Sequence, residues 1–216
     1  MGAPGGARRG ATGPDADARP GRGVGAREEG VSDAPVRAFF AIDLDAAARA
    51  SALGVLRVLR EAPGGGAVRW VRPEGLHVTL HFLGNIERAQ ATPLARAVSE
   101  EVREIARFDL ALGAARLFPS VRRPRVVALD VKPAERVAEL AAAVERGVTR
   151  EGFEPEGRSF RAHLTLGRIR QGGGPDPSGV AAAGSSPVEE VVLFRSELSR
   201  SGARYTPLER VGLGHP

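Results

Sequence analysis

The sequence contains no cysteine among its 216 residues. Disulfides, thiolate metal ligands and a cysteine nucleophile are therefore excluded. The chain also lacks a run of about 20 apolar residues, which a membrane helix requires. Its first residues lack the apolar core of a signal peptide. These absences favour a cytoplasmic protein whose chemistry depends on other side chains.

Lysine is almost absent, because Lys132 is the one lysine among 31 basic residues. Against 26 acidic residues this gives a formal net charge of +5. A basic balance held almost wholly by arginine is a weak indicator of nucleic-acid binding. The 42% hydrophobic content is typical of a soluble globular protein with one sizeable core or two small lobes.

Large apolar side chains are scarce in residues 1–34, which are rich in Gly, Ala, Pro, Arg and Asp. Such a segment cannot bury enough surface to offset the entropy of ordering, so we predict a disordered tail. The composition changes abruptly at Pro35. A second interpretation of this change is that the start codon is misassigned and that translation begins near Val24 or Val31. We predict a single domain over residues 35–216.

From Val36 onward, short β-like runs alternate with helical periodicity. The pattern predicts an α+β fold with a long Gly/Pro/Ser-rich loop at 171–187, either mobile or facing a substrate. The spacing allows two similar halves, before and after about residue 120. Strands are expected at 36–42, 68–71, 76–83, 108–117, 125–131, 162–169, 188–198 and 204–208, and helices at 45–61, at 89–107 and around Val137 to Val148.

One phrase occurs twice in the chain. His77-Val78-Thr79-Leu80 and His163-Leu164-Thr165-Leu166 each place a histidine two residues before a threonine within a strand-like run. Residues i and i+2 of a strand point to the same face, so each histidine projects together with its threonine. The intervening apolar residues point into a core, and each strand becomes a rigid support for a polar face.

Two histidines with two hydroxyls suit phosphoryl chemistry. Near neutral pH one imidazole can accept a proton while the other donates one, as displacement at phosphorus requires. Threonine hydroxyls can bind the non-bridging oxygens, where charge develops in the transition state. The sequence shows no clustered His and Asp, so a metal phosphodiesterase is disfavoured and no metal is expected.

The flanking residues resemble a known family. Segments 37–42, 70–84 and 163–168, with Pro124-Arg125 and the segment 193–198, are similar to the two-histidine (HxTx) phosphoesterases of the RNA 2',3'-cyclic phosphodiesterase, or bacterial 2'-5' RNA ligase, type. The resemblance covers residues 36–210. It implies a bilobal α+β fold, in which two antiparallel sheets with outer helices are related by pseudo-twofold symmetry around a central cleft.

The resemblance also implies the chemistry. His77 would be the proton donor and His163 the proton acceptor, with Thr79 and Thr165 binding the substrate phosphate. RNA 2',3'-cyclic phosphate ends would open to 2'-phosphomonoesters, and the reverse reaction would make 2'-5' linkages. No cofactor or metal is required, and we expect a monomer.

Other candidates stay open at this point. His81 would share the face of Thr79, either lining the cleft as a third imidazole or solvated at the strand end. Arg125 and Arg168 are candidate RNA contacts, although an ideal strand would point Arg168 away from His163, which leaves a salt-bridge or solvent role. Four aromatic residues could stack on a base or pack in the core, with packing favoured: Phe39, Phe118, Phe153 and Tyr205.

Two alternative functions are not excluded by the sequence. One is a phosphodiesterase for a small cyclic nucleotide or a 2'-5' oligonucleotide. The other is an RNA-binding module without activity, which the two intact His-x-Thr phrases disfavour.

Overall fold

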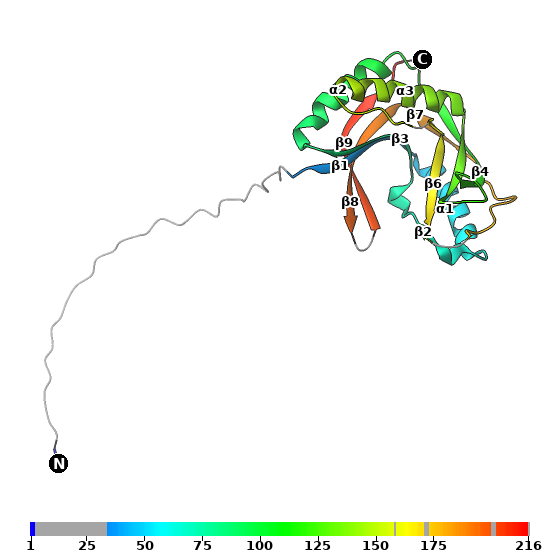
Figure 1. The fold of residues 1–216 in the computed structure, drawn as a ribbon, viewed down its shortest axis with the longest axis horizontal. Helices are drawn as coiled ribbons and strands as arrows, with labels where there is room; N and C mark the ends of the chain where they lie inside the picture. The colour runs from blue at the N-terminus through cyan, green and yellow to red at the C-terminus, as the bar shows by residue number, and fades with distance from the viewer. Residues whose placement is uncertain (3–33, 158, 171–172, 200–201, 216) are drawn as a thin grey trace, which may run out of the picture. The chain divides into compact units, whose positions relative to one another are not determined.

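The computed structural model describes residues 1–2, 34–157, 159–170, 173–199 and 202–215. The predicted tail at 1–34 therefore lies almost wholly outside the described residues. From Val36 onward, strands and helices alternate, and the strands form two antiparallel sheets (Figure 1). None of the helices in the described part has the length and apolar character needed to cross a membrane.

The first sheet has the strand order β3-β1-β8-β9. Along β1, Ala38, Phe40 and Ile42 are buried in the main core, whereas Phe39 and Ala41 belong to a smaller apolar cluster on the opposite face. This sheet therefore packs apolar side chains on both faces. Its strands are β1 (Val36–Asp43), β3 (His77–Ile86), β8 (Glu190–Ser199) and β9 (Gly202–Gly212).

The second sheet has the strand order β2-β6-β5-β4-β7. Val127, Leu129 and Val131 of β5 point into the main core, as do Leu164 and Leu166 of β6. Side chains alternate between the two faces of a strand, so the residues between these core residues lie on the opposite face of the sheet. Its strands are β2 (Val68–Trp70), β4 (Phe108–Phe118), β5 (Val126–Lys132), β6 (His163–Ile169) and β7 (Ser185–Val188).

Three helices pack on these sheets (Figure 1). They are α1 (Ala46–Glu61), α2 (Ala91–Val102) and α3 (Ala134–Arg150). Asp45 caps the start of α1, because its carboxylate accepts a 2.7 Å hydrogen bond from the backbone N–H of Ala48. Helix α1 contacts β2, β4 and β7. Helix α2 packs on α3 and β9, and α3 also contacts β3 and β5.

The two sheets are not the two halves of the chain. Strands β1 and β3 precede residue 120 and are completed by β8 and β9, while β2 and β4 join a sheet whose other strands follow residue 120. The halves are nevertheless similar, because each contains two antiparallel strands that pair with each other and are joined through a helix. These units are β1-α1-β3 and β5-α3-β6. The expected pseudo-twofold relation therefore connects β3 with β6.

Two predicted elements differ from the structure. The segment predicted as a loop at 171–187 contains the start of β7 and a bridge between Ala114 and Ala181, since the edge of β4 offers unpaired backbone groups. The helix predicted over 89–107 corresponds to α2, which is shorter and ends at Val102. The backbone after it pairs instead with the C-terminal segment, where the Gly214 N–H donates to the carbonyl oxygen of Ile105.

Candidate active site

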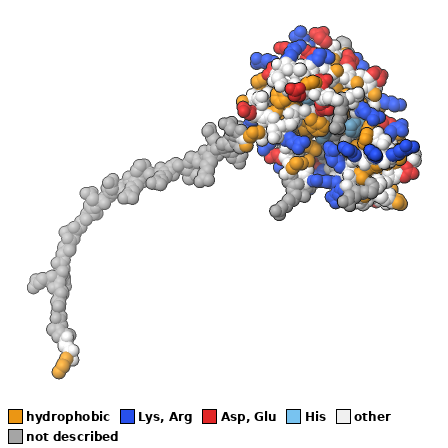
Figure 2. All heavy atoms as spheres, viewed as in Figure 1, with side chains coloured by type: hydrophobic (Ala, Val, Ile, Leu, Met, Phe, Trp, Pro, Cys, Tyr) orange, Lys and Arg blue, Asp and Glu red, His pale blue; other side chains and the backbone are white. Residues whose placement is uncertain are grey.

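The two His-x-Thr phrases are presented in the same way. His77 and Thr79 lie on β3, and His163 and Thr165 lie on β6. The six residues that start at each histidine follow the same order of exposure in both strands: intermediate, buried, intermediate, buried, buried, exposed. We call the side of each sheet that carries the histidine and threonine the histidine face. In the space-filling view, histidine is visible near the middle of the molecule with arginine side chains gathered around it (Figure 2).

A β-bulge explains the two adjacent buried residues. In β3, Thr79 pairs with Ala41 and His81 pairs with Phe40, so Leu80 has no partner. Strand β6 has the same irregularity one residue after its threonine. An extra residue in one strand reverses the face to which the following side chains point. The fourth residue after each histidine therefore faces the core, and the fifth faces the histidine face.

The prediction for His81 was wrong because of this bulge. His81 is 2% exposed and lies on the buried face, so it neither lines the histidine face nor is solvated. Its Nε2 has no hydrogen-bond partner among the described residues, and desolvation lowers its pKa. Phe82 occupies the position expected for His81. It is 51% exposed, and its ring lies 5.8 Å from that of Phe39.

The same bulge decides the position of Arg168. On β6 it turns Gly167 toward the core, where a Cβ would meet Val68 Cγ1 at 2.5 Å, and it leaves Arg168 exposed. Arg168 therefore shares the histidine face, contrary to the orientation of an ideal strand. Arg125 is also exposed, and its backbone N–H donates to the carbonyl oxygen of Phe118 at 2.6 Å.

His77 lies in an aromatic enclosure. Its ring centroid is 4.7 Å from that of Phe39, 5.0 Å from that of Tyr205 and 6.2 Å from that of Phe194. Desolvation by these surroundings lowers the pKa of His77 to about 4, against a smaller raising effect of a hydrogen bond to the Gly75 backbone. The free imidazole is therefore neutral at pH 7.

His163 is supported by one stacked ring. The Phe118 ring lies 4.9 Å from the His163 ring at an interplanar angle of 22°, and the Arg161 guanidinium lies 5.1 Å from the centre of the Phe118 ring. The His163 Nδ1 is 2.7 Å from the Arg161 carbonyl oxygen. Phe118, Phe39 and Tyr205 thus pack against the histidines.

His163 bonds to the backbone carbonyl two residues earlier, that of Arg161, and the backbone of Gly75, two residues before His77, raises the pKa of His77 as a hydrogen-bond acceptor does. A carbonyl acceptor requires the hydrogen on the nitrogen that faces it. With Nδ1 of His163 occupied in this way, its Nε2 is the nitrogen left to exchange a proton with a substrate. The two phrases share this mode of orientation as well as their strand position.

Each histidine also has an aspartate as its direct neighbour on the adjacent strand. Asp43 pairs with His77, and Asp130 pairs with His163. An arginine binds each carboxylate: Arg49 Nη2 lies 2.6 Å from Asp43 Oδ1, and Arg116 Nε lies 2.5 Å from Asp130 Oδ2. No periodic pattern in the sequence signals that each histidine lies beside an aspartate, since the two paired strands are distant in sequence.

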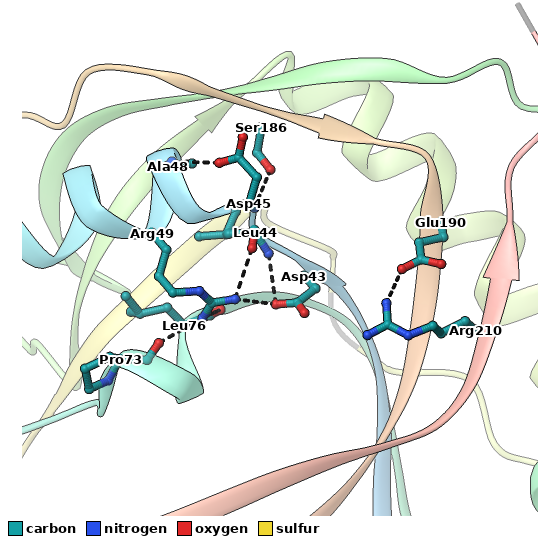
Figure 3. Close-up of polar contacts among 10 residues, drawn as sticks. All are labelled: Asp43, Leu44, Asp45, Ala48, Arg49, Pro73, Leu76, Ser186, Glu190 and Arg210. Atoms are coloured by element: carbon teal, nitrogen blue, oxygen red, sulfur yellow. Dashed lines mark hydrogen bonds and ion pairs between the residues drawn. The ribbon is translucent and has the colours of Figure 1, made fainter.

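Arg49 makes further contacts with the residues at the end of β1 and with those just before β3 (Figure 3). Its Nη1 donates to the carbonyl oxygens of Pro73 at 2.8 Å and Leu76 at 3.1 Å, and its Nη2 donates to that of Leu44 at 3.1 Å. One guanidinium of α1 therefore connects the end of β1 to the start of β3. The charge of Asp43 raises the pKa of His77, and that of Arg49 lowers it.

The described part of the loop predicted at 171–187 lies beside a separate cavity. A cavity of about 930 Å³ is lined by residues 173–181, by residues 114–117 of β4 and by the turn that follows. It contains neither of the two histidines of the phrases. Across the described ranges, no three His, Asp or Glu side chains gather in a way that could hold a metal ion.

The chain matches the family described as LigT like phosphoesterase over residues 42–128 and 127–205. An RNA 2',3'-cyclic phosphodiesterase of Methanothermobacter thermautotrophicus is 34% identical over 81% of this chain and 97% of that protein. One of Escherichia coli is 33% identical over 83% and 97%.

Solved structures agree with this match. LigT of E. coli in its apo form has a TM-score of 0.68 at 32% identity, covering 84% of this chain and 99% of that one. A protein of Thermus thermophilus has a TM-score of 0.72 at 29% identity, covering 83% and 98%. The sequence match, the shared fold and the two equivalent His-x-Thr strands lead to one conclusion: this chain belongs to the LigT-like phosphoesterase family.

Proposed function

We propose that this protein opens RNA ends carrying a 2',3'-cyclic phosphate, leaving a 2'-phosphomonoester. The observation that carries the proposal is the equivalent presentation of His77-x-Thr79 and His163-x-Thr165 on two strands with the same bulge. Relatives named RNA 2',3'-cyclic phosphodiesterase support it, because they align with nearly their whole length.

In the proposed reaction His163 accepts a proton from water, whose oxygen forms a bond to phosphorus. The bond from phosphorus to the 3' oxygen breaks, and His77 donates its proton to that oxygen. The hydroxyls of Thr79 and Thr165 donate to the non-bridging oxygens, where negative charge develops. An RNA 5'-hydroxyl in place of water would form a 2'-5' linkage: His163 would accept the proton of that hydroxyl as its oxygen bonds to phosphorus, and His77 would again donate its proton to the departing 3' oxygen.

The donor role requires a protonated His77 in the complex. Free His77 has a pKa lowered to about 4 by desolvation. A bound phosphodiester places a negative charge beside the ring, and a nearby opposite charge favours the protonated form of a histidine. Substrate binding therefore raises the pKa of His77 in the direction that its role requires.

The first experiment compares three substrates in the presence of EDTA: an oligoribonucleotide with a cyclic end, a cyclic mononucleotide and a 2'-5' dinucleotide. We expect the cyclic end to open to the 2'-phosphate. A 3'-phosphate product, or no opening, contradicts the mechanism. Cleavage of the 2'-5' dinucleotide alone would instead favour a phosphodiesterase for small 2'-5' nucleotides.

The second experiment separates the roles of the two histidines. A cyclic substrate with sulfur in the bridging 3' position releases a thiolate, which needs no proton donor. His77→Ala should keep most of its rate on this substrate and lose most of it on the oxygen substrate, whereas His163→Ala should be inactive on both. His215→Ala, outside both phrases, is the matched control. The reverse pattern would exchange the two roles.

A further inference from the structure

Three arginines on the histidine face have no acidic partner. Arg37 of β1, Arg69 of β2 and Arg168 of β6 are exposed, and within the described part of the chain none of them forms an ion pair or a side-chain hydrogen bond. Arginines on the outer helix α3 differ, since Arg136 and Arg146 pair with glutamates. Three unpaired positive charges therefore lie on the side of the catalytic phrases, where no acidic side chain neutralises them in the described part of the chain.

Two of these arginines are direct neighbours across two strands. Arg69 pairs with Arg168 in the register of β2 and β6. Their flanking residues, Val68 and Ile169, pack against the main core, so both guanidinium groups extend from the histidine face. Like charges directly opposite each other destabilise a sheet. An anion bound between them would remove that repulsion.

The third arginine reaches the same region from the first sheet. Arg37 pairs with Ser196, and Ser196 pairs with Tyr205, so the three lie in one row across β1, β8 and β9. The positive charges of Arg168, Arg37 and Arg69 all act to lower the pKa of Tyr205, against a larger raising effect of burial. Three arginines from two sheets thus act on the charge of one hydroxyl.

This cluster adjoins the catalytic site. The Tyr205 ring lies 5.0 Å from the His77 ring in an edge contact, and the charge of Arg168 also acts on His77. A chain whose terminal phosphate lies between the two His-x-Thr phrases would carry its next phosphate within reach of these arginines. Arginine is well suited to bind phosphate through paired N–H donors.

We propose that Arg37, Arg69 and Arg168 form a second anion site, which binds the internucleotide phosphate adjacent to the cyclic end of an RNA strand. This inference rests on the proposed function and adds a preference to it. The protein would act on a cyclic end within a chain more efficiently than on a cyclic mononucleotide, because only the chain carries the second phosphate.

The test compares kcat/KM for a nucleoside 2',3'-cyclic phosphate with kcat/KM for a dinucleotide that ends in the same cyclic nucleotide. The wild-type protein should prefer the dinucleotide. Arg69→Gln should reduce that preference about tenfold, the usual cost of one charged hydrogen bond. Arg96→Gln is the matched control, because Arg96 is an exposed arginine on α2, and it should keep the wild-type ratio.

A neutral linkage tests whether charge is the cause. A dinucleotide joined by a methylphosphonate should be opened no better than the mononucleotide, and its rate should fall less steeply with salt, since one phosphate contact of a single strand contributes a slope of about 0.7. A methylphosphonate dinucleotide as good as the phosphodiester, or an unchanged ratio in Arg69→Gln, would overturn the second site. Failure to open any cyclic phosphate would overturn the proposed function instead.

Discussion

The guanidinium of Arg49 donates a 3.1 Å hydrogen bond to the carbonyl oxygen of Leu76, the residue immediately before His77. The same group binds the carbonyl of Pro73 and the carboxylate of Asp43. Helix α1 thus fixes the backbone from which His77 projects. Small displacements of a reacting group can reduce a rate about a hundredfold.

We therefore expect Arg49→Met to lower kcat about 10- to 100-fold with little change in KM. The substitution keeps an apolar stem of similar length and removes all the donors. Arg57→Met, at an exposed position of the same helix, should leave both constants unchanged. Steady-state kinetics with a cyclic mononucleotide provide the measurement, and a change confined to KM would contradict a positioning role.

The pH dependence of kcat/KM should show its acidic limb near pH 4, where the lowered pKa of His77 lies, rather than near the ordinary value of 6.5. This ratio reports the ionisation of the free enzyme. The limb is the same whether His77 donates or accepts, because both roles require the same total number of protons on the two histidines. Circular dichroism at each pH confirms that the protein is folded.

The charges beside His77 should move that limb in opposite directions. Asp43 raises the pKa of His77 and Arg49 lowers it. Asp43→Asn should therefore shift the acidic limb to lower pH, and Arg49→Met should shift it to higher pH. A loss of structure alone would not produce shifts of opposite sign, so equal shifts in both variants would refute this electrostatic account.

Replacement of His81 should affect stability and not catalysis. Its buried Nε2 has no partner in the described residues, and an unpaired buried polar atom is costly. His81→Leu should match or exceed the wild-type free energy of unfolding in urea, while His81→Ala should lose about 2 kcal/mol by leaving a cavity. A large fall in kcat for His81→Leu would contradict this prediction and would indicate that His81 contributes to the active site.

Two glycine substitutions should have opposite effects. A Cβ at Gly167 would lie 2.5 Å from Val68 Cγ1 and 3.0 Å from Trp70 Cε3, whereas a Cβ at Gly54 of α1 would meet no atom within 4 Å. Gly167→Ala should cost about 1–3 kcal/mol through overpacking. Gly54→Ala should add about 1 kcal/mol, since alanine is the better helix former. Urea unfolding of both variants measures the difference.

The exposed ring of Phe82 gives a prediction for substrate binding. A base stacked on an aromatic ring is worth about 1–3 kcal/mol, so Phe82→Ala should lower kcat/KM about 5- to 100-fold. Phe82→Tyr should keep the activity. Val58→Ala is the control, because Val58 on α1 is 56% exposed, close to the exposure of Phe82. Equal activity of Phe82→Ala and wild type would exclude stacking there.

The two strands that contain the His-x-Thr phrases were predictable from the sequence. The faces to which the side chains after each threonine point were not. Alternation places Val78 and Leu164 in the core and the His-Thr pairs opposite them. A bulge arises from pairing with a distant strand, so local periodicity cannot predict it. Gly167 was the one local signal, because glycine within a strand often accompanies a bulge.

Contacts between distant segments were also beyond the reach of the sequence. The family resemblance assigned His77 and His163, yet Asp43 and Arg49 approach His77 through strand pairing and a helix cap that spacing does not specify. The unpaired arginines indicated an anion site only after the register placed Arg69 opposite Arg168. The net charge of the whole chain does not reveal that arrangement.

The exchange of strands between the two halves of the chain has a consequence during synthesis. The sheet that holds His77 is completed by β8 and β9, which the ribosome makes last. Domains fold as units during translation, and contacts distant in sequence form slowly. We therefore expect the surroundings of His77 to be incomplete in a nascent chain that already contains both histidines, until the final hairpin has left the exit tunnel.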